Sequence, residues 1–194
     1  MSRKVLILLF DDVEVLDFAG PFEVFSVAGR QKASRPFSVN TCAAKTTILA
    51  RNGLSINPAY VLQEAPVSEV LIIPGGQGTR RLLKDEPLLK WVRERSSKAE
   101  LTLSVCTGSL ILGAAGLLTG REATTHHGAF DELRAVGREI IVCEDRRIVD
   151  AGQIVTSGGI SAGIDMSLHV VARLCGDSEA RETASYMEYR WPFE

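Results

Sequence analysis

Uninterrupted apolar runs limit the folds open to this chain more than any other feature of its sequence. Residues 5–10 and 70–73 contain no polar side chain. A strand that is apolar on both faces has to be covered on both faces, and such strands are typical of parallel sheets with helices on either side. Helical patterns follow these runs, so the sequence predicts an α/β fold.

The segments between these runs give a regular alternation of elements. Strands are predicted over residues 4–10, 37–43, 48–56, 70–74 and 101–105, with an antiparallel hairpin over 147–156 at the edge of the sheet. Helices are predicted over residues 16–29, 87–95, 109–115, 128–136, 160–174 and 178–189. No repeat, low-complexity tract or linker interrupts the alternation. We therefore expect a single domain over residues 1–194, with a doubly wound, mostly parallel sheet in a three-layer sandwich.

The composition excludes several classes of protein. Lys and Arg total 22 against 24 Asp and Glu, the net charge is −2, and no basic stripe predicts nucleic-acid binding. The apolar run 5–10 is too short for a signal peptide or a membrane span, so we expect a cytoplasmic protein that does not bind membranes. The four cysteines lie far apart without a C-x-x-C pair, which argues against a disulfide framework and a structural zinc site.

Cys106 lies where a predicted strand turns sharply into a predicted helix, in the sequence SVCTG at residues 104–108. Unpaired backbone N–H groups and the positive end of a helix dipole surround a side chain in such a position, and both favour thiolate over thiol. The same strand–turn–helix arrangement defines a nucleophile elbow. A buried cysteine that packs as a small apolar side chain is the alternative, and the local sequence leaves both open.

Three loops should meet at the carboxyl ends of the strands, where open parallel sheets bind ligands. They are residues 11–17, 74–78 and 106–108. Gly75 and Gly76 offer backbone N–H groups that no side chain shields, so with the N–H of Thr107 they could form an oxyanion hole. A phosphate cradle is the competing use of this glycine loop, but the sequence lacks both the P-loop lysine and the G-x-G-x-x-G pattern.

Five motifs, in this order, resemble the ThiJ/PfpI family over nearly the whole chain. They are LDFAGPFEVF at 16–25, VLIIPGG at 70–76, SVCTGSL at 104–110, ATTH at 123–126 and GGISAGID at 158–165. The first motif, with Thr instead of His after the cysteine, most resembles isonitrile hydratases and the ligand-binding half of AraC-type regulators. The resemblance implies a flavodoxin-like fold, a homodimer and a reaction on a small molecule without a cofactor.

Two positions depart from related proteins of the superfamily. In PfpI-type proteases a His follows the Cys immediately, whereas this chain has Thr107 there, so a Cys–His peptidase mechanism is disfavoured. The isonitrile hydratase branch typically has Trp after Thr-Thr-His, whereas this chain has His127, which predicts a more polar pocket wall. The resemblance alone therefore does not identify the substrate.

Asp17 is predicted to be the partner of Cys106. A carboxylate beside a thiol in a partly apolar crevice shares a proton with it, so the pair titrates as one unit. By the local sequence alone, Asp17 could equally cap the helix that follows the first strand. The resemblance favours catalysis, because isonitrile hydratases use the Cys, the following Thr and an Asp at this place, here Cys106, Thr107 and Asp17.

Further side chains are assigned to the same crevice. His126 is predicted to lie near Cys106, as the comparable residue does in the superfamily, while the adjacent His127 should point to the opposite side of an extended segment. Ile160 and Ser161 are assigned to substrate binding together with His126 and the two glycines. No ligand spacing supports a metal site built from Cys106, His126 and a carboxylate.

The isonitrile hydratase resemblance implies that the Cys106 thiolate attacks the terminal carbon of an isonitrile, with Asp17 as general acid. The product of this step is a covalent thioimidate. A water molecule then attacks the same carbon and releases an N-substituted formamide. This water is activated by Asp17 or by another water that Thr107 holds. A glyoxalase-like enzyme, a small-molecule-binding regulator and a sensor that works by oxidation of Cys106 are the alternatives.

Two expectations concern partners. The chain ends at Glu194 without room for the helix-turn-helix pair of AraC-type regulators, so direct DNA binding is not expected. Phe18, Phe22 and Phe25 exceed what one helix stripe easily buries, so they predict an apolar contact with a second copy of the chain beside the pocket.

Overall fold

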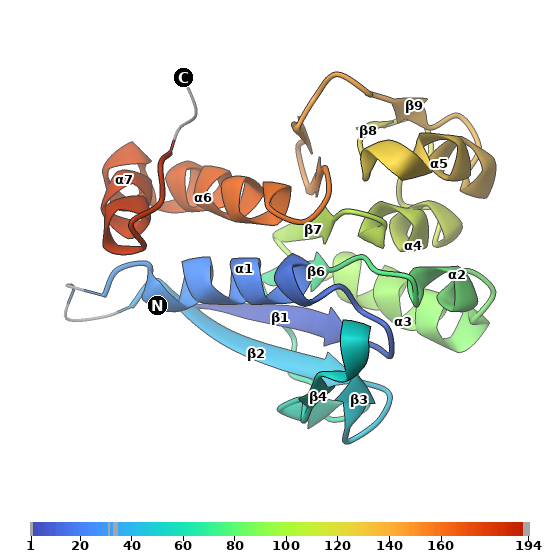
Figure 1. Ribbon diagram of the computed structural model, residues 1–194, viewed down its shortest axis with the longest axis horizontal. Helices are drawn as coiled ribbons and strands as arrows, with labels where there is room; N and C mark the ends of the chain where they lie inside the picture. Colours follow the sequence, from blue (N-terminus) through green and yellow to red (C-terminus); the bar gives the residue numbers. More distant parts are fainter. Residues whose placement is uncertain (1, 31, 33–34, 192–194) are drawn as a thin grey trace.

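The computed structural model describes residues 2–30, 32 and 35–191, and the part of the DNA-binding prediction that rests on residues 192–194 lies outside them. The central sheet consists of β1 (Arg3–Leu9), β2 (Phe37–Ala43), β5 (Tyr60–Val61), β6 (Val70–Ile73), β7 (Leu101–Val105), β10 (Ile148–Ala151) and β11 (Ile154–Ser157). Their order is β10-β11-β7-β6-β1-β2-β5 (Figure 1). Every neighbouring pair is parallel except β10 and β11, which form the predicted antiparallel hairpin at the edge.

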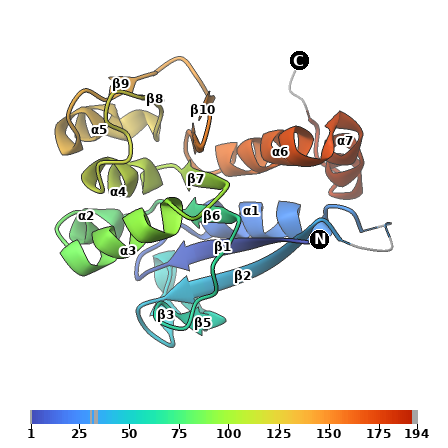
Figure 2. The ribbon, with the colours of Figure 1, turned by 180° about the vertical axis from the view of Figure 1, so that it is seen from behind.

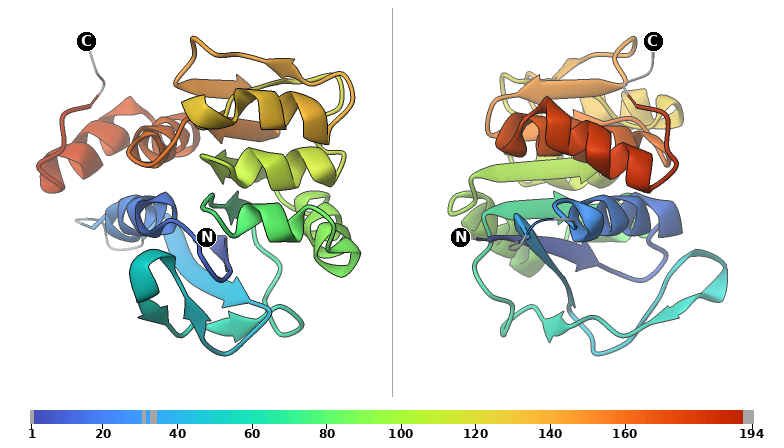
Figure 3. Two further views of the ribbon diagram at one scale, coloured as in Figure 1. Left: turned by 45° about the vertical axis from the view of Figure 1, so that its right-hand side comes forward. Right: turned by 90° about the vertical axis from the view of Figure 1, so that its left-hand side faces the viewer.

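Helices cover both faces of this sheet, as its continuous apolar strands require. One face carries α1 (Val15–Val27), α6 (Ala162–Cys175) and α7 (Asp177–Tyr186), and the other carries α2 (Thr79–Leu82), α3 (Glu86–Ser96), α4 (Gly108–Ala114) and α5 (Phe130–Val136) (Figure 3). In the described part of the chain, none of these helices has both the length and the apolar character needed to cross a membrane. The predicted doubly wound, mostly parallel α/β sandwich is confirmed.

The predicted strand over residues 48–56 is wrong. The segment folds instead into β3 (Ile48–Leu49), the 3-10 turn η1 (Arg51–Gly53) and β4 (Ser55–Ile56), which form a small hairpin outside the main sheet (Figure 1). Asn52 and Gly53 have φ values of +59° and +83°, which belong to a turn and not to a strand. The N–H of Asp12 donates to Leu49 O at 2.8 Å and so fixes the hairpin to the loop after β1.

Several short elements have no counterpart in the prediction. They are β5, α2, and the pair of strands β8 (Glu122–Ala123) and β9 (Ile141–Val142), while the start of the predicted helix over 128–136 is the 3-10 helix η2 (His127–Ala129). Two-residue strands and single-turn helices are shorter than the periods that reveal secondary structure in a sequence. They join longer elements that were predicted, so they alter the connections of the fold and not its layers.

Candidate active site

Four loops meet at the carboxyl ends of the neighbouring strands β1, β6, β7 and β11. They are residues 10–14, 74–78, 106–107 and 158–161. The N–H of Glu14 donates to Gly75 O at 2.9 Å, and the N–H of Cys106 donates to Gly158 O at 3.0 Å. The predicted convergence of the first three loops is confirmed. The fourth loop closes the site on the β11 side.

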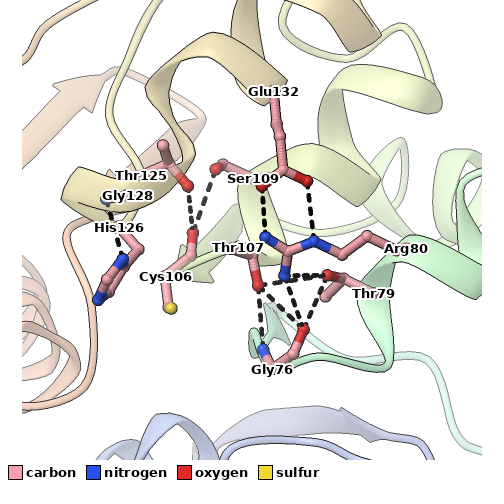
Figure 4. Close-up of polar contacts among 10 residues, drawn as sticks. All are labelled: Gly76, Thr79, Arg80, Cys106, Thr107, Ser109, Thr125, His126, Gly128 and Glu132. Atoms are coloured by element: carbon pink, nitrogen blue, oxygen red, sulfur yellow. Dashed lines mark hydrogen bonds and ion pairs between the residues drawn. The ribbon is translucent and has the colours of Figure 1, made fainter.

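Cys106 occupies a strained position between β7 and α4. Its φ is +55°, a left-handed value that costs a residue with a side chain about 1–3 kcal/mol. Its carbonyl accepts hydrogen bonds from the hydroxyls of Thr125 at 2.9 Å and Ser109 at 3.2 Å (Figure 4). A side chain at Gly108 would bring Cβ to 2.0 Å from Ile73 O, so the turn requires glycine. This geometry is that of the predicted nucleophile elbow.

Asp17 brings a fully buried carboxyl group to Cys106. It lies in the first turn of α1, and its oxygens accept hydrogen bonds from the N–H groups of Gly75 at 3.0 Å and Ile160 at 3.1 Å. A further hydrogen bond links the carboxyl group to the Cys106 thiol. These partners all lie outside α1, so the interpretation of Asp17 as a helix cap is wrong.

The protein holds both members of this pair close to their protonated forms. Burial raises the pKa of Asp17 to about 7, although the hydrogen bonds from the thiol and two backbone N–H groups act to lower it. Burial, followed by the negative charge of Asp17, raises the pKa of the Cys106 thiol to about 12, against the opposing effect of Thr107. The thiolate expected from the helix dipole is therefore wrong for the resting site. Near pH 7 the site holds a thiol beside a carboxyl group that is about half ionised and can accept the thiol proton in its ionised form.

The N–H groups of Gly75 and Gly76 already have acceptors within the protein. The first donates to Asp17, and the second donates to the Thr107 hydroxyl at 3.0 Å. The predicted oxyanion hole would need both of these hydrogen bonds to break. The donor that does face the sulfur is the N–H of Thr107. A Cβ at Gly75 would lie 2.5 Å from Thr107 N, so this close approach requires glycine.

Thr107 connects the site to a polar network that the sequence analysis missed. Its hydroxyl lies 3.2 Å from Gly76 O and accepts a hydrogen bond from Thr79 Oγ1 at 3.3 Å (Figure 4). Arg80 donates to Gly76 O at 3.3 Å and pairs with both carboxylate oxygens of Glu132, at 2.6 and 2.8 Å. The network thus ties α2 and α5 to the glycine loop. The only sequence signal for it is the position of Thr79 and Arg80 directly after that loop.

His126 and His127 form one wall of the site. The prediction that they point to opposite sides is wrong, because the chain turns into η2 at His127 and the two ring centroids are 4.1 Å apart. The N–H of Gly128 donates to His126 Nδ1 at 3.1 Å. Burial, followed by the electrostatic effect of His127, lowers the pKa of His126 and so favours the neutral form of its ring. Figure 4 shows the sulfur of Cys106 between the His126 ring and Thr107.

A hollow of about 500 Å³ opens beside this wall. Both histidines, Thr125, Arg147 and Ile160 contribute to its lining, which holds several further polar side chains. Ile160 is 40% exposed and has a left-handed φ of +55°, while its N–H holds Asp17. Thr125, in the same lining, holds the Cys106 carbonyl, so two residues of the hollow contact the two members of the reactive pair.

Ser161 belongs to a network that supports the fourth loop. Its hydroxyl accepts a hydrogen bond from Arg147 at 3.1 Å, and Arg147 also donates to the buried Asp165 at 2.6 Å. The hydroxyl of Tyr189 donates to the other oxygen of Asp165 at 3.0 Å. The Ser161 hydroxyl is therefore engaged in holding the 158–161 loop, through which Ile160 contacts Asp17. None of these supporting residues except Ser161 was singled out in the sequence analysis.

Metal ligands do not gather in the part of the chain that the structure describes. Within it, no three side chains of the His, Cys, Asp or Glu type lie close enough together to hold a metal ion. Cys42, Cys106, Cys143 and Cys175 are all free thiols.

Comparison with known proteins agrees with the motif resemblance. The pattern of the DJ-1/PfpI family matches residues 3–173. An isonitrile hydratase from Pseudomonas putida is 37% identical over 191 residues, which cover 97% of this chain and 79% of that protein. The HTH-type transcriptional regulator CdhR from Pseudomonas aeruginosa is 29% identical over 91% of this chain, but this match covers only 52% of the regulator.

The same relationship is visible in three dimensions. The crystal structure of a ThiJ/PfpI family protein from Pseudomonas syringae matches with a TM-score of 0.88 and 30% sequence identity, over 100% of this chain and 77% of that one. Three findings support one assignment: the family pattern covers most of the chain, the fold is similar, and a relative is more than 30% identical over most of the chain. The chain belongs to the DJ-1/PfpI family.

Proposed function

We propose that the protein is a cysteine-dependent hydratase of the isonitrile hydratase type, which adds water to a small electrophilic carbon through a thioimidate on Cys106. The observation that carries this proposal is the hydrogen bond between the Cys106 thiol and the buried Asp17 carboxyl group. The pKa of Asp17 is about 7. A general base works best when its pKa is close to the working pH. The similarity to an isonitrile hydratase over nearly the whole chain supports the proposal.

In the first step, the Asp17 carboxylate takes the proton of the Cys106 thiol while the sulfur attacks the terminal carbon of the isonitrile. A carbon–sulfur bond forms and the carbon–nitrogen triple bond becomes a double bond. Asp17 returns the same proton to that carbon. The product is a thioimidate, and Asp17 is a carboxylate again.

Hydration uses the same base. Asp17 accepts a proton from a water molecule as its oxygen attacks the thioimidate carbon, and passes this proton to the nitrogen. The tetrahedral adduct then breaks its carbon–sulfur bond, and its hydroxyl proton moves through Asp17 to the departing Cys106 sulfur. An N-substituted formamide leaves and the thiol is restored, so the isonitrile has gained one water.

Thr107 is proposed to stabilise the sulfur while it carries negative charge. Its backbone N–H faces the sulfur of Cys106. Its hydroxyl contacts both Gly76 O, at 3.2 Å, and the sulfur, so its proton can turn from the carbonyl to the sulfur as charge develops there. Hydrogen bonds to an ionised group are stronger than those between neutral groups, so this contact favours the attacking state.

Turnover of a substrate panel tests the proposal. The purified protein should convert alkyl or aryl isonitriles to N-formamides, and Cys106→Ser should abolish this conversion. Cys143→Ser, a matched change at another buried free cysteine, should leave it intact. Methylglyoxal and small amides in the same panel test the glyoxalase-like alternative. A hydratase is contradicted if no isonitrile is consumed, or if Cys106→Ser still consumes it.

A small-molecule-binding regulator is the second candidate, and the similarity to CdhR specifically favours it. In that case Cys106 would bind a ligand or respond to oxidants, and the hollow beside His126 would recognise the ligand. The two candidates differ in one measurement. A regulator or sensor should show saturable binding or sulfenic acid at Cys106 without turnover, whereas a hydratase forms product through many cycles.

We also propose a cytoplasmic homodimer. Four free thiols suit a reducing compartment. Phe25 contributes no area to a dimer contact, because it is fully buried and packs edge-on against Phe37 with centroids 5.0 Å apart. The most exposed large apolar side chains of α1 are Leu16 and Phe22, at 37% and 38%, and Phe18 is half-buried. Light scattering at micromolar concentration checks the assembly, and a monomer would contradict it.

A further inference from the structure

A second cavity, of about 430 Å³, lies at the ends of β1 and β2 and contains neither Cys106 nor Asp17 in its lining. Its sides come from α2 and α3, and β3 lies on its outer side. Figure 2 shows these elements together at the end of the sheet where β1 and β2 finish. Apolar side chains form most of its wall, among them Leu8, Leu9, Ile48, Leu62, Leu88 and Trp91.

The wall is held in place by contacts of the protein itself. Trp91 Nε1 donates to Leu62 O at 3.2 Å, and the guanidinium of Arg95 lies 5.2 Å from the Trp91 ring centroid. On the opposite side, the hydrogen bond from Asp12 N–H to Leu49 O holds the β3–β4 hairpin against the loop after β1. The cavity is thus formed before any ligand enters, as small-molecule sites usually are.

Charged groups at the mouth of the cavity balance one another. Lys45, Arg81, Asp11 and Asp85 are the charged lining residues, two of each sign. Lys45 Nζ lies 2.7 Å from Asp11 Oδ2, and Arg81 pairs with Asp12 at 2.7 Å. Asp85 accepts a hydrogen bond from the first turn of α3 at 3.1 Å. A charged ligand would have to compete with these pairs, so the mouth favours an uncharged one.

We propose that this cavity is a second small-molecule site, which takes an uncharged, largely apolar compound with one hydrogen-bonding end. Its volume falls within the range of about 300–1,000 Å³ that is typical of ligand sites. A cavity of about 150 Å³ holds benzene, so this one has room for about 12 to 16 non-hydrogen atoms. Gln63 and Lys45 at the mouth supply hydrogen-bond donors for the polar end.

The cavity and the Cys106 site share backbone. Phe10 and Gly78 both line the cavity. Phe10 belongs to the loop 10–14, which leads into α1, and Gly78 belongs to the loop 74–78, which also contains Gly75. Gly75 in turn donates to the Asp17 carboxyl. A ligand against Phe10 and Gly78 therefore touches both loops that position this carboxyl group. We expect occupancy of the cavity to change the rate at which iodoacetamide alkylates Cys106.

Fluorescence of Trp91 tests the site directly, because this side chain lies in the wall. The chain has two tryptophans, so Trp191→Phe leaves Trp91 as the only one. Titration of this variant with 4-phenyl-1-butanol should give a saturable change in emission. The matched ions 4-phenylbutyrate and 4-phenylbutylamine should bind at least about tenfold more weakly. No saturable change overturns the site, and equal binding of either ion overturns its preference for uncharged ligands.

Two exposed alanines supply matched variants. Ala44 lines the cavity, whereas Ala59 is absent from its lining. Ala44→Phe should fill the cavity and weaken binding of the alcohol by about tenfold or more, while Ala59→Phe should change it by less than about twofold. Both positions are exposed, so circular dichroism should show folded proteins. Undiminished binding in Ala44→Phe would place the ligand elsewhere.

Cys106 provides the remaining control. Binding of the alcohol should persist in Cys106→Ala, because this residue is not part of the cavity wall, and its loss there would move the ligand to the catalytic site. In the unsubstituted chain, saturating alcohol should change the alkylation rate of Cys106 by about twofold or more. An unchanged rate overturns the link between the two sites. Neither measurement depends on turnover of an isonitrile, so it is independent of the proposed function.

Discussion

Two hollows lie at the carboxyl end of the sheet: the reactive site around Cys106 and the apolar cavity lined by Trp91. Their polar groups act in opposite ways. At the reactive site, the buried Asp17 carboxyl binds a thiol and two backbone N–H groups, and both Cys106 and Ile160 have left-handed backbone conformations. At the apolar cavity, Asp11 pairs with Lys45, whose hydrogen bond lowers the pKa of Asp11. The first arrangement lowers stability and keeps a proton ready for transfer, whereas the second leaves its apolar wall free for a ligand.

The largest difference between the two hollows should be in turnover. Cys106→Ala removes the nucleophile, so formamide production should fall by about 10⁴-fold or more. Ala44→Phe leaves Cys106 and Asp17 in place and can reach them only through the shared loops, so turnover should change by less than about tenfold. Chromatographic measurement of the formamide gives both numbers. Comparable losses in the two variants would mean that the hollows do not have separate roles.

Substitution of one carboxylate in each hollow should change stability in opposite directions. The pKa of Asp17 is raised in the fold from its ordinary 3.8 to about 7, so the contribution of this one group to stability is greatest below about pH 4 and falls by up to about 4 kcal/mol as the pH rises to about 7. Asp17→Asn has no carboxyl group to ionise, so its free energy of unfolding should increase relative to that of the wild type over this pH interval. The pKa of Asp11 is lowered, so its contribution is present above its ordinary pKa and is lost as the pH falls through the folded value. Asp11→Asn should therefore be less stable than the wild type at pH 7.

Urea unfolding at about pH 3, pH 5 and pH 8 measures both carboxylate variants, because the Asp11 contribution changes mainly between the first two values and the Asp17 contribution mainly between the last two. The quantity of interest is the difference in the free energy of unfolding between each variant and the wild type. Only the sign of its change with pH separates the two environments. If both variants lost stability equally as the pH rose, burial would not be the dominant influence on Asp17.

The next effect concerns the Asp17 carboxyl in catalysis. Asp17→Asn keeps the shape of the side chain but removes the base, so kcat should fall by about 10²-fold or more. The same change should lower the pKa of the Cys106 thiol, because the charge and hydrogen bond of Asp17 raise it. Titration of the thiolate by its ultraviolet absorbance detects this shift. Full turnover in a variant that only lost stability would return Asp17 to a structural role.

The contrast between the hollows also explains what the sequence could predict of the fold. The strand β6 was predicted because every one of its residues is buried, and an uninterrupted apolar run records this directly. β7 is buried throughout as well, but Thr102 and Ser104 alternate with its apolar residues. The segment 48–56 misled because Ile48, Leu49, Leu54 and Ile56 give an apolar pattern similar to that of a strand. The turn signal, Asn52 and Gly53, lies inside that pattern and decides the structure.

Motifs located the reactive residues, but they did not give their protonation states. Cys106 and Asp17 were identified by resemblance, and the structure brings them together. The thiolate prediction failed because it considered only the helix N-terminus, whereas burial has the largest effect on the thiol pKa. Burial depends on all the elements around a residue. The hydrogen bond from Ile160 N–H to Asp17 likewise joins positions far apart in the chain, and no local pattern reveals it.

The pH dependence of kcat/KM is the smallest effect and the most specific to this pair. Asp17 has to be a carboxylate to accept the thiol proton, and with a pKa of about 7 its ionised fraction falls about tenfold for each pH unit below that value. The value of kcat/KM should therefore rise about tenfold per unit up to about pH 7 and then stay level while Cys106 remains a thiol. Asp17→Asn should abolish this rising limb, and Ala44→Phe should retain it. A limb that persisted in Asp17→Asn would assign the ionisation to another group, and the buried carboxyl would then differ from Asp11 in stability alone.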